Sequence, residues 1–168
     1  MCKTENMLEW TVSRIDDLSL RMVASDSGVR MIEFPEFRST VGDRNDSNPF
    51  LVETARQLNA YFAGKLRIFD LKLDMRGTPF QMRVWEELLK IPYGETRSYQ
   101  QIAVATGTPK AVRAVGAANG ANPVPIVVPC HRVIGSNGKL TGFGGGLPLK
   151  KRLLELEGAL TMSLSPSS

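Results

Sequence analysis

The residues best suited to chemistry are Cys130 and His131, which are neighbours in the sequence. Cys130 is the only cysteine away from the N-terminus, and His131 is the only histidine in the chain. The thiolate is the nucleophilic form of cysteine, and a nearby base or positive charge produces it at neutral pH. Adjacent side chains diverge on a strand or a helix, so a bridging water or a bent backbone at Pro129 would have to connect the thiol to the imidazole. The alternative is that Cys130 is a small buried hydrophobe and His131 a hydrogen-bonded structural residue.

The segment before Cys130 predicts how the thiol is positioned. Val124 to Val128 is short, apolar and rich in β-branched residues, a pattern typical of a buried strand. Pro129 would end that strand, because proline cannot donate to a sheet ladder. Cys130 is therefore expected at the end of a buried strand, beside an imidazole and an arginine.

The sequence around this cysteine is similar to that of a known family. Pro129-Cys-His-Arg-Val-Ile-Gly135, preceded by Asn122-Pro-Val-Pro125, resembles the active-site signature of the O6-alkylguanine-DNA alkyltransferases, which are single-use DNA repair proteins. The resemblance runs from about Gly77 to Glu157 and is closest to the bacterial type. Further matching motifs are Tyr61-Phe-Ala-Gly64, Thr78-Pro-Phe-Gln81, Ile91-Pro-Tyr-Gly-Glu-Thr96, Ser98-Tyr-Gln-Gln101, Arg113-Ala-Val-Gly116 and the loop from Gly142 to Gly146.

The resemblance implies four catalytic residues for transfer of an alkyl group from guanine O6 to sulfur. Cys130 would be the nucleophile, and His131 would deprotonate it through water. Glu157 matches the glutamate that holds the histidine, and Tyr99 matches the tyrosine that hydrogen-bonds or protonates a guanine ring nitrogen. From residue type alone, Glu157 could equally be a surface helix residue, and Tyr99 could simply pack against a helical core.

The resemblance also implies a substrate pocket, formed by Asn122, Val133, Phe143 and Gly144. In the family, the glycine-rich loop that contains Phe143 and Gly144 closes over the base and directs a backbone amide at guanine O6. Some members have Tyr-Ser at these two positions, so this chain keeps the amide but lacks the hydroxyl contact. The loop is not a phosphate-binding loop, because the Gly-Lys-Ser/Thr ending is missing.

Double-stranded DNA is the partner that the resemblance implies, bound through the minor groove with little sequence preference. The target nucleotide must leave the base stack, and Arg113 matches the arginine that takes its place. Small residues around Arg113 would let a helix lie deep in the groove, although tight packing inside the protein would need them too. The residues expected to contact DNA are Ser98, Lys110, Arg113, Ala114, Asn122 and Arg132.

Charge is distributed unevenly along the chain. Residues 1–75 carry 10 Lys and Arg against 12 Asp and Glu, whereas residues 76–168 carry 11 against 5. No carboxylate occurs between Thr96 and Leu154, which favours a polyanionic partner, although a solvated basic face would have the same composition. One histidine and two cysteines supply neither a four-ligand Cys/His zinc site nor a disulfide framework. A free functional thiol, together with the lack of an apolar stretch of membrane-spanning length, predicts a cytoplasmic protein with no membrane partner and no metal.

Two regions of different character are expected to position the candidate site residues, and the expected fold class is α+β. Residues 1–75 should form a small antiparallel-sheet α/β scaffold domain, with strands within 8–35, a loop at 39–49, a helix at 50–62 and another strand at 67–73. Residues 76–160 should form a mostly helical domain, with helices at 78–90, 99–105, 110–119 and 147–158. The two short helices joined by Gly107-Thr-Pro109 are typical of a helix-turn-helix. Residues 161–168 are predicted to be a disordered tail.

The sequence thus predicts a monomeric DNA repair protein that removes alkyl groups from O6-alkylguanine, once per molecule and without a cofactor. O4-alkylthymine is a further candidate substrate. A binding module that recognises damage without chemistry is the alternative from another class, and a Cys–His hydrolase is a third. Retention of Cys130, His131 and Glu157 argues against the binding module. Stoichiometry separates the three functions, because they predict no transfer, one transfer or many transfers per protein.

Overall fold

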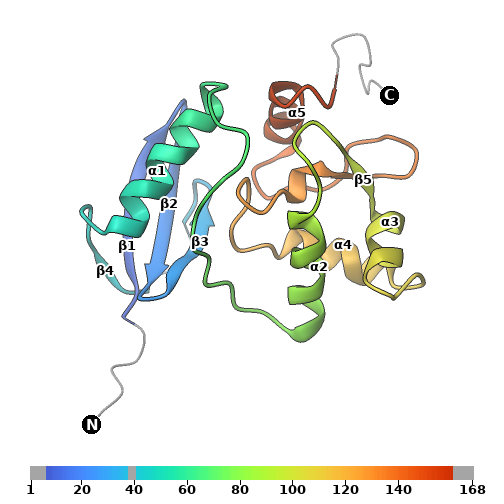
Figure 1. The fold of residues 1–168 in the computed structure, drawn as a ribbon, viewed down its shortest axis with the longest axis horizontal. Coiled ribbons are helices and arrows are strands. Elements are labelled where there is room, and N and C mark those ends of the chain that lie inside the picture. Colours follow the sequence, from blue (N-terminus) through green and yellow to red (C-terminus); the bar gives the residue numbers. More distant parts are fainter. Residues whose placement is uncertain (1–6, 38–40, 161–168) are drawn as a thin grey trace. The chain divides into compact units, whose positions relative to one another are not determined.

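The structure is a computed structural model that describes residues 7–37 and 41–160. The predicted tail at 161–168 lies outside the described residues. The chain divides into two compact units, one ending at Arg76 and the other beginning at Gly77. A sheet dominates the first unit and helices dominate the second, so the α+β prediction is confirmed (Figure 1).

The sheet of the first unit has the strand order β3-β2-β1-β4. The first three strands are antiparallel, as predicted, but β4 pairs in parallel with β1 and makes the sheet mixed. This short strand lies in the segment predicted to be a loop. Its backbone pairs because Asp43 donates to the Leu8 carbonyl and Asn45 to the Trp10 carbonyl. The strands are β1 (Glu9–Ile15), β2 (Leu18–Ser25), β3 (Gly28–Glu33) and β4 (Asp43–Arg44).

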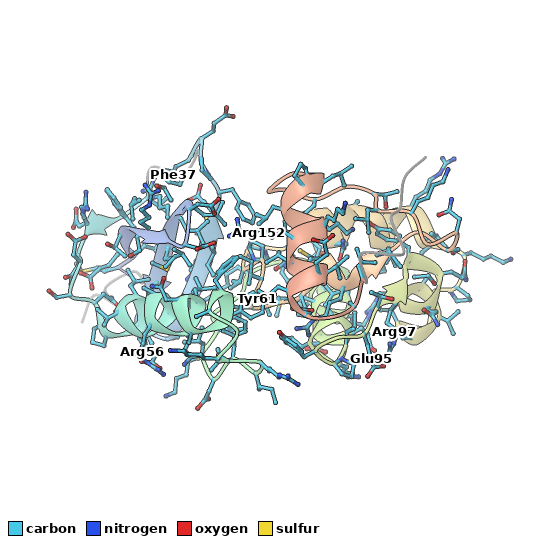
Figure 2. The ribbon with its side chains drawn as sticks, turned by 90° about the horizontal axis from the view of Figure 1, so that it is seen from above. Phe37, Arg56, Tyr61, Glu95, Arg97 and Arg152 are labelled. Carbon is cyan, nitrogen blue, oxygen red and sulfur yellow. The ribbon has the colours of Figure 1, made fainter. Side chains whose placement is uncertain are left out.

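Helix α1 (Pro49–Phe62) packs on this sheet through its apolar side. The Asn48 side chain accepts from the first free backbone amides and fixes where the helix begins. Tyr61 is fully buried, whereas Arg56 lies on the exposed side and pairs with Glu53 (Figure 2). The helix predicted for this segment is therefore confirmed.

The predicted strand at 67–73 does not form. Among the described residues, one isolated bridge, between Val29 and Leu73, links this segment to the sheet. The side-chain amide of Gln57 instead pairs with both backbone groups of Asp70, at 2.9 Å each. Because the Gln57 side chain satisfies the backbone hydrogen-bonding groups of Asp70, these groups do not need partners in a neighbouring strand.

The second unit contains four α-helices and a two-stranded parallel sheet within the described residues. Trp85 anchors its core: its ring is buried and its indole nitrogen donates to the Ala118 carbonyl at 2.8 Å. The capping box predicted at Thr78 and Gln81 is present. The elements are α2 (Pro79–Leu89), β5 (Arg97–Ser98), α3 (Tyr99–Ala105), α4 (Val112–Gly120), a 3-10 helix η1 (Cys130–Arg132), β6 (Val133–Ile134) and α5 (Leu147–Leu156).

Helices α3 and α4 pack against each other and are joined by a short turn, as a helix-turn-helix requires. Gly107 takes a φ of +76° just after α3, a conformation that favours glycine. Helix α4 begins at Val112 rather than at Lys110, because the Ala111 amide is still part of the turn and donates to the Thr108 carbonyl.

The prediction of a strand from Val124 to Val128 is wrong. The residues are buried, as an apolar run predicts, but they form a tight turn in which the Val128 amide donates to the Val124 carbonyl. Ile126 has a φ of +74°. Prolines 123, 125 and 129 have no amide hydrogen to give to a ladder, so the segment folds back instead of extending.

Candidate active site

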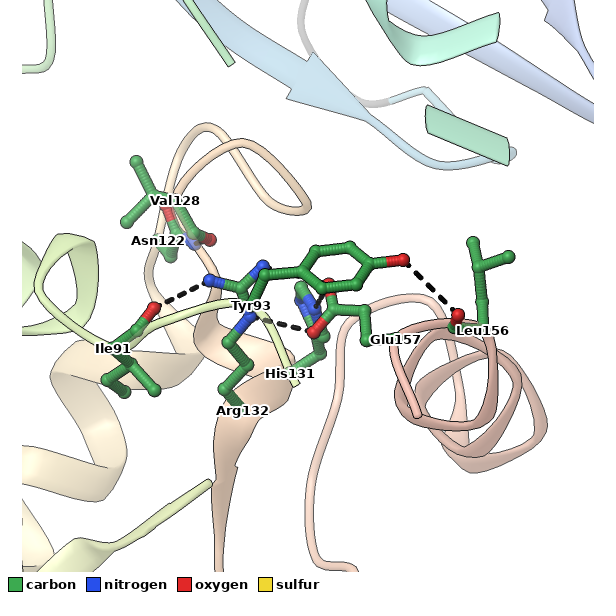
Figure 3. A network of polar contacts seen from close by, with 8 residues as sticks. All are labelled: Ile91, Tyr93, Asn122, Val128, His131, Arg132, Leu156 and Glu157. Carbon is green, nitrogen blue, oxygen red and sulfur yellow. Dashed lines mark hydrogen bonds and ion pairs between the residues drawn. The ribbon is translucent and has the colours of Figure 1, made fainter. Parts of the chain in front are cut away.

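Cys130 begins η1 directly after this turn and is buried, with 5% of its surface exposed. Asn122 stabilises the turn from inside: its amide nitrogen donates to the Val128 carbonyl at 2.8 Å (Figure 3). Its side-chain oxygen accepts from the Val124 amide at 3.0 Å. Asn119, on α4, donates to the Cys130 carbonyl at 3.4 Å. Two asparagines in and just after α4 therefore position the backbone that carries the thiol.

His131 and Glu157 meet in the interior of the second unit. The imidazole Nε2 lies 2.8 Å from Glu157 Oε2, and both side chains are fully buried. Glu157 is the C-cap of α5, so the end of that helix sets where the carboxylate lies. The alternative, that Glu157 is a surface helix residue, is excluded, and the pairing expected from the family is present.

The electrostatics of the pair favour a neutral imidazole. Burial lowers the pKa of His131, and the hydrogen bond and charge of Glu157 oppose that shift. His131 Nδ1 is buried and has no hydrogen-bond partner among the described residues. With the Nε2 proton directed at Glu157, Nδ1 is the nitrogen that can accept a proton.

The surroundings of Cys130 favour the protonated form of its thiol. Burial raises its pKa, and the Asn122 side chain and the Lys150 charge oppose that increase. The sequence allowed either a base or a nearby positive charge to produce the thiolate. Because burial favours the protonated thiol, a base has to remove the proton when the thiol reacts, which is the role expected for His131.

Lys150, on α5, is a site residue that the sequence marked only as one of the basic residues between Thr96 and Leu154. Its ammonium is fully buried and donates to the Val133 carbonyl at 2.6 Å and to the Thr141 carbonyl at 2.7 Å. Burial lowers its pKa to about 8, while the Cys130 charge opposes the shift. No sequence motif could have revealed these contacts of Lys150, because its partners are backbone carbonyls.

The Thr141 carbonyl also accepts a hydrogen bond from the Tyr99 hydroxyl at 3.3 Å, and the Thr141 hydroxyl donates to Tyr99 Oη at 3.2 Å. Tyr99 and Lys150 therefore hold the start of the glycine-rich loop from two elements, α3 and α5. Within the loop, Gly144 is exposed and Phe143 is half-buried. Val133 is fully buried, and its carbonyl is committed to Lys150.

Comparison with known proteins gives the same family for both units. The matching family models are described as 6-O-methylguanine DNA methyltransferase, DNA binding domain, over residues 79–159, and ribonuclease-like domain, over residues 19–75. A methylated-DNA–protein-cysteine methyltransferase of Methanosarcina barkeri is 50% identical over 139 residues, which cover 81% of this chain and 88% of that protein. The chain belongs to the 6-O-methylguanine DNA methyltransferase family.

Further members of this methyltransferase family support the match. A Mycobacterium bovis protein of the same name is 68% identical over 101 residues, which cover 60% of this chain and 61% of that relative, less than two thirds of its length. Mycobacterium tuberculosis OGT, solved in complex with DNA, superposes with a TM-score of 0.81 at 49% identity, covering 91% of this chain and 93% of that one. The family resemblance predicted from the sequence is confirmed.

Several of the residues expected to contact DNA lie in or just before α4, and Ser98 lies at the start of α3. Arg113 and Ala114 are exposed on the helix, and Lys110 is exposed in the turn before it. Ser98 uses its hydroxyl to cap α3, where it accepts from the Gln101 amide at 3.0 Å. These residues remain candidates for the DNA interface.

Arg132 was also expected to contact DNA, but its side chain lies inside the second unit. Its guanidinium is buried and is occupied by Glu157 and by the Ile91 carbonyl (Figure 3). Lys150 likewise lies inside the second unit, and Arg97 pairs with Glu95 at 3.2 Å (Figure 2). The segment from Thr96 to Leu154 therefore presents fewer free positive charges than its composition predicts.

No helix among the described residues is long and apolar enough to cross a membrane. Within the same residues, no three His, Cys, Asp or Glu side chains come together in a way that could hold a metal ion.

Proposed function

We propose that this chain repairs DNA by transferring an alkyl group from O6 of guanine to Cys130, irreversibly and once per molecule. The observation that carries the proposal is the buried Cys130 thiol, which directly precedes a histidine paired with a carboxylate at 2.8 Å. Membership in the 6-O-methylguanine DNA methyltransferase family supports the same reaction. O4-alkylthymine is a second substrate of the same chemical kind, since it also carries an alkyl group on an exocyclic oxygen.

The reaction is a displacement at the alkyl carbon, for which the thiol must first lose its proton. His131 Nδ1 accepts that proton through a water molecule, and Glu157 stabilises the resulting imidazolium. The sulfur then forms a bond to the alkyl carbon as the bond from that carbon to guanine O6 breaks. The electron pair of the broken bond stays on guanine, which takes up a proton, so the products are a thioether and a normal guanine.

Stabilisation of the departing guanine falls to Tyr99 and the glycine-rich loop. The Tyr99 hydroxyl donates to, or protonates, a guanine ring nitrogen after exchanging its contact with Thr141. A backbone amide near Phe143 and Gly144 points at O6, and Asn122 and Val133 line the pocket. Such fixed donors are effective where charge develops in a water-excluded site.

Duplex DNA binds through α4, which enters the minor groove. Ala114, Ala117 and Gly120 are exposed on this helix and present little bulk, which would let the backbone approach closely. Arg113 fills the space that the flipped nucleotide leaves, and flipping costs a few kcal/mol. Contacts to phosphates give little sequence preference.

The protein acts as a monomer, in the reducing cytoplasm that a free thiol requires, and the balanced reaction needs no cofactor. The domain at 1–75 is a scaffold, and the domain at 76–160 binds DNA and carries out the transfer.

Intact-mass measurement after incubation with a methylated duplex tests the proposal directly. The expected result is the addition of one methyl group per protein, located on Cys130, with none added to the Cys130→Ser variant. Binding without any added mass would support a damage-binding module, and release of product in excess of protein would support a hydrolase. Either outcome would overturn the proposed function.

A further inference from the structure

Glu157 is held by more than the histidine. Arg132 Nε donates to Glu157 Oε1 at 2.8 Å and Arg132 Nη2 donates to Oε2 at 2.9 Å, so the guanidinium binds both carboxylate oxygens (Figure 3). The third nitrogen, Nη1, donates to the Ile91 carbonyl at 2.7 Å and fixes the guanidinium itself. The Glu157 side chain is fully buried, and 8% of the Arg132 side chain is exposed.

Glu157 Oε2 therefore accepts hydrogen bonds from both Arg132 Nη2 and His131 Nε2. A planar guanidinium bound to both oxygens sets the plane of the carboxylate, and that plane decides where the imidazole must lie to reach Oε2. Cys130, His131 and Arg132 are successive residues of one 3-10 turn. The same short turn therefore supplies the thiol, the imidazole and the residue that orients the partner of the imidazole.

Charge balance gives Arg132 a second effect. A buried carboxylate needs a compensating positive charge, because an isolated buried ion is very costly. Arg132 supplies that charge permanently, since a guanidinium is always protonated in proteins. Without Arg132, the charge that balances Glu157 would come from protonation of His131. An imidazolium has no lone pair with which to accept the thiol proton.

We propose that Arg132 is a positioning residue of the alkyl-transfer site: it orients and neutralises Glu157 so that His131 stays uncharged, with its proton on Nε2 and the Nδ1 lone pair free. The proposal rests on the proposed function in one respect only, namely that the base is needed for transfer. Burial is the largest cause that lowers the pKa of His131, and the charges of Arg132 and Lys150 act in the same direction. This role replaces the DNA contact that the sequence suggested for the same residue.

The single histidine of the chain makes a direct test feasible. Nitrogen NMR of protein labelled only at histidine reports the protonation of both ring nitrogens of His131, with no competing signal. At about pH 7 the wild type should show one protonated and one unprotonated nitrogen, whereas Arg132→Met should show both protonated. Arg132→Lys should resemble the wild type, because it keeps the charge. Arg83→Met, an exposed arginine on α2, is the matched control and should change nothing.

Alkyl transfer from a free O6-alkylguanine base, which needs no DNA contact, gives the second measurement. Arg132→Met should slow this reaction by about tenfold or more at neutral pH. The double variant Arg132→Met/Glu157→Gln carries no unbalanced buried charge, so its His131 should return to the neutral form and its rate should match that of Glu157→Gln within about twofold. This comparison also serves if Arg132→Met alone does not fold.

A neutral His131 in Arg132→Met, or a double variant about tenfold slower than Glu157→Gln, would overturn the proposal. The NMR result does not depend on catalysis. A wild type that never accepts an alkyl group would remove the proposed function while leaving the NMR test of Arg132 intact.

Discussion

Replacing Lys150 with methionine should change how the stability of the protein depends on pH. The Lys150 ammonium is buried against the carbonyls of Val133 and Thr141, and burial lowers its pKa from 10.5 to about 8. In the unfolded chain the same group regains its ordinary pKa. Between these two values the unfolded state therefore binds one more proton than the folded state.

The sign follows from that proton count. Because the unfolded state binds more protons, the free energy of unfolding rises with pH across this window. The contribution of Lys150 is fully present above its unfolded pKa of 10.5 and is lost as pH falls through about 8. The shift corresponds to about 3 kcal/mol, at about 1.4 kcal/mol for each pKa unit. Lys150→Met should lack this slope and should also lose about 1–3 kcal/mol at every pH, because the buried Val133 carbonyl loses its donor while the Thr141 carbonyl keeps the Tyr99 hydroxyl.

Urea unfolding followed by circular dichroism measures the effect, with a series from about pH 7 to about pH 10. Both proteins should carry Cys130→Ser, because burial raises the pKa of the thiol and gives a pH dependence of opposite sign. The stability difference between the Lys150 protein and Lys150→Met should grow by about 2–3 kcal/mol over that range. Lys151→Met, at the exposed neighbouring position, is the control and should run parallel to its parent. Parallel curves for Lys150→Met as well would refute the argument, since Lys150 would then not be a desolvated ammonium.

The other predictions concern transfer and binding. Cys130→Ser should abolish methyl transfer and keep DNA affinity, because a hydroxyl ionises far less than a thiol while α4 is untouched; a methyl group found on the variant would contradict this. Glu157→Gln should slow transfer by about tenfold or more and raise the pKa of Cys130, which a rate–pH profile would show; a profile that overlays the wild type would exclude a role for the carboxylate. Arg113→Ala should slow repair of duplex DNA strongly and leave reaction with free alkylguanine base nearly unchanged, whereas equal losses on both substrates would indicate a structural role. Affinity for any duplex sequence should fall steeply with salt because phosphate contacts release counterions, and a flat dependence would rule out electrostatic binding.

The sequence predicted features that depend on near neighbours. Thr78 and Gln81 are three residues apart, and their capping box formed as expected because both partners lie in one helical turn. Helix α3 has the predicted bounds for the same reason, with Ser98 and Gln101 as its own capping box. Burial of the segment before Cys130 was also predicted, because hydrophobicity alone determines it.

The sequence failed where a long-range contact decides the outcome. Arg132 and Lys150 looked like surface charges, since nothing local reveals that a carboxylate 25 residues away or the carbonyls of a loop will bury them. The conformation of Val124 to Val128 depended on the Asn122 side chain, whose two hydrogen bonds close a turn that β-propensity would have extended. The family resemblance supplied the pairing of His131 with Glu157, which spacing could not.

The position of Trp85 gives the protein an intrinsic optical probe. The chain has two tryptophans, and each compact unit contains one of them. Trp10 lies under the guanidinium groups of Arg21 and Arg44, whereas the indole of Trp85 is bound to the Ala118 carbonyl of α4. In a Trp10→Phe variant, the emission of Trp85 would therefore come from the base of the helix proposed to enter DNA, so docking and the later transfer step could be timed in one stopped-flow trace without any attached dye.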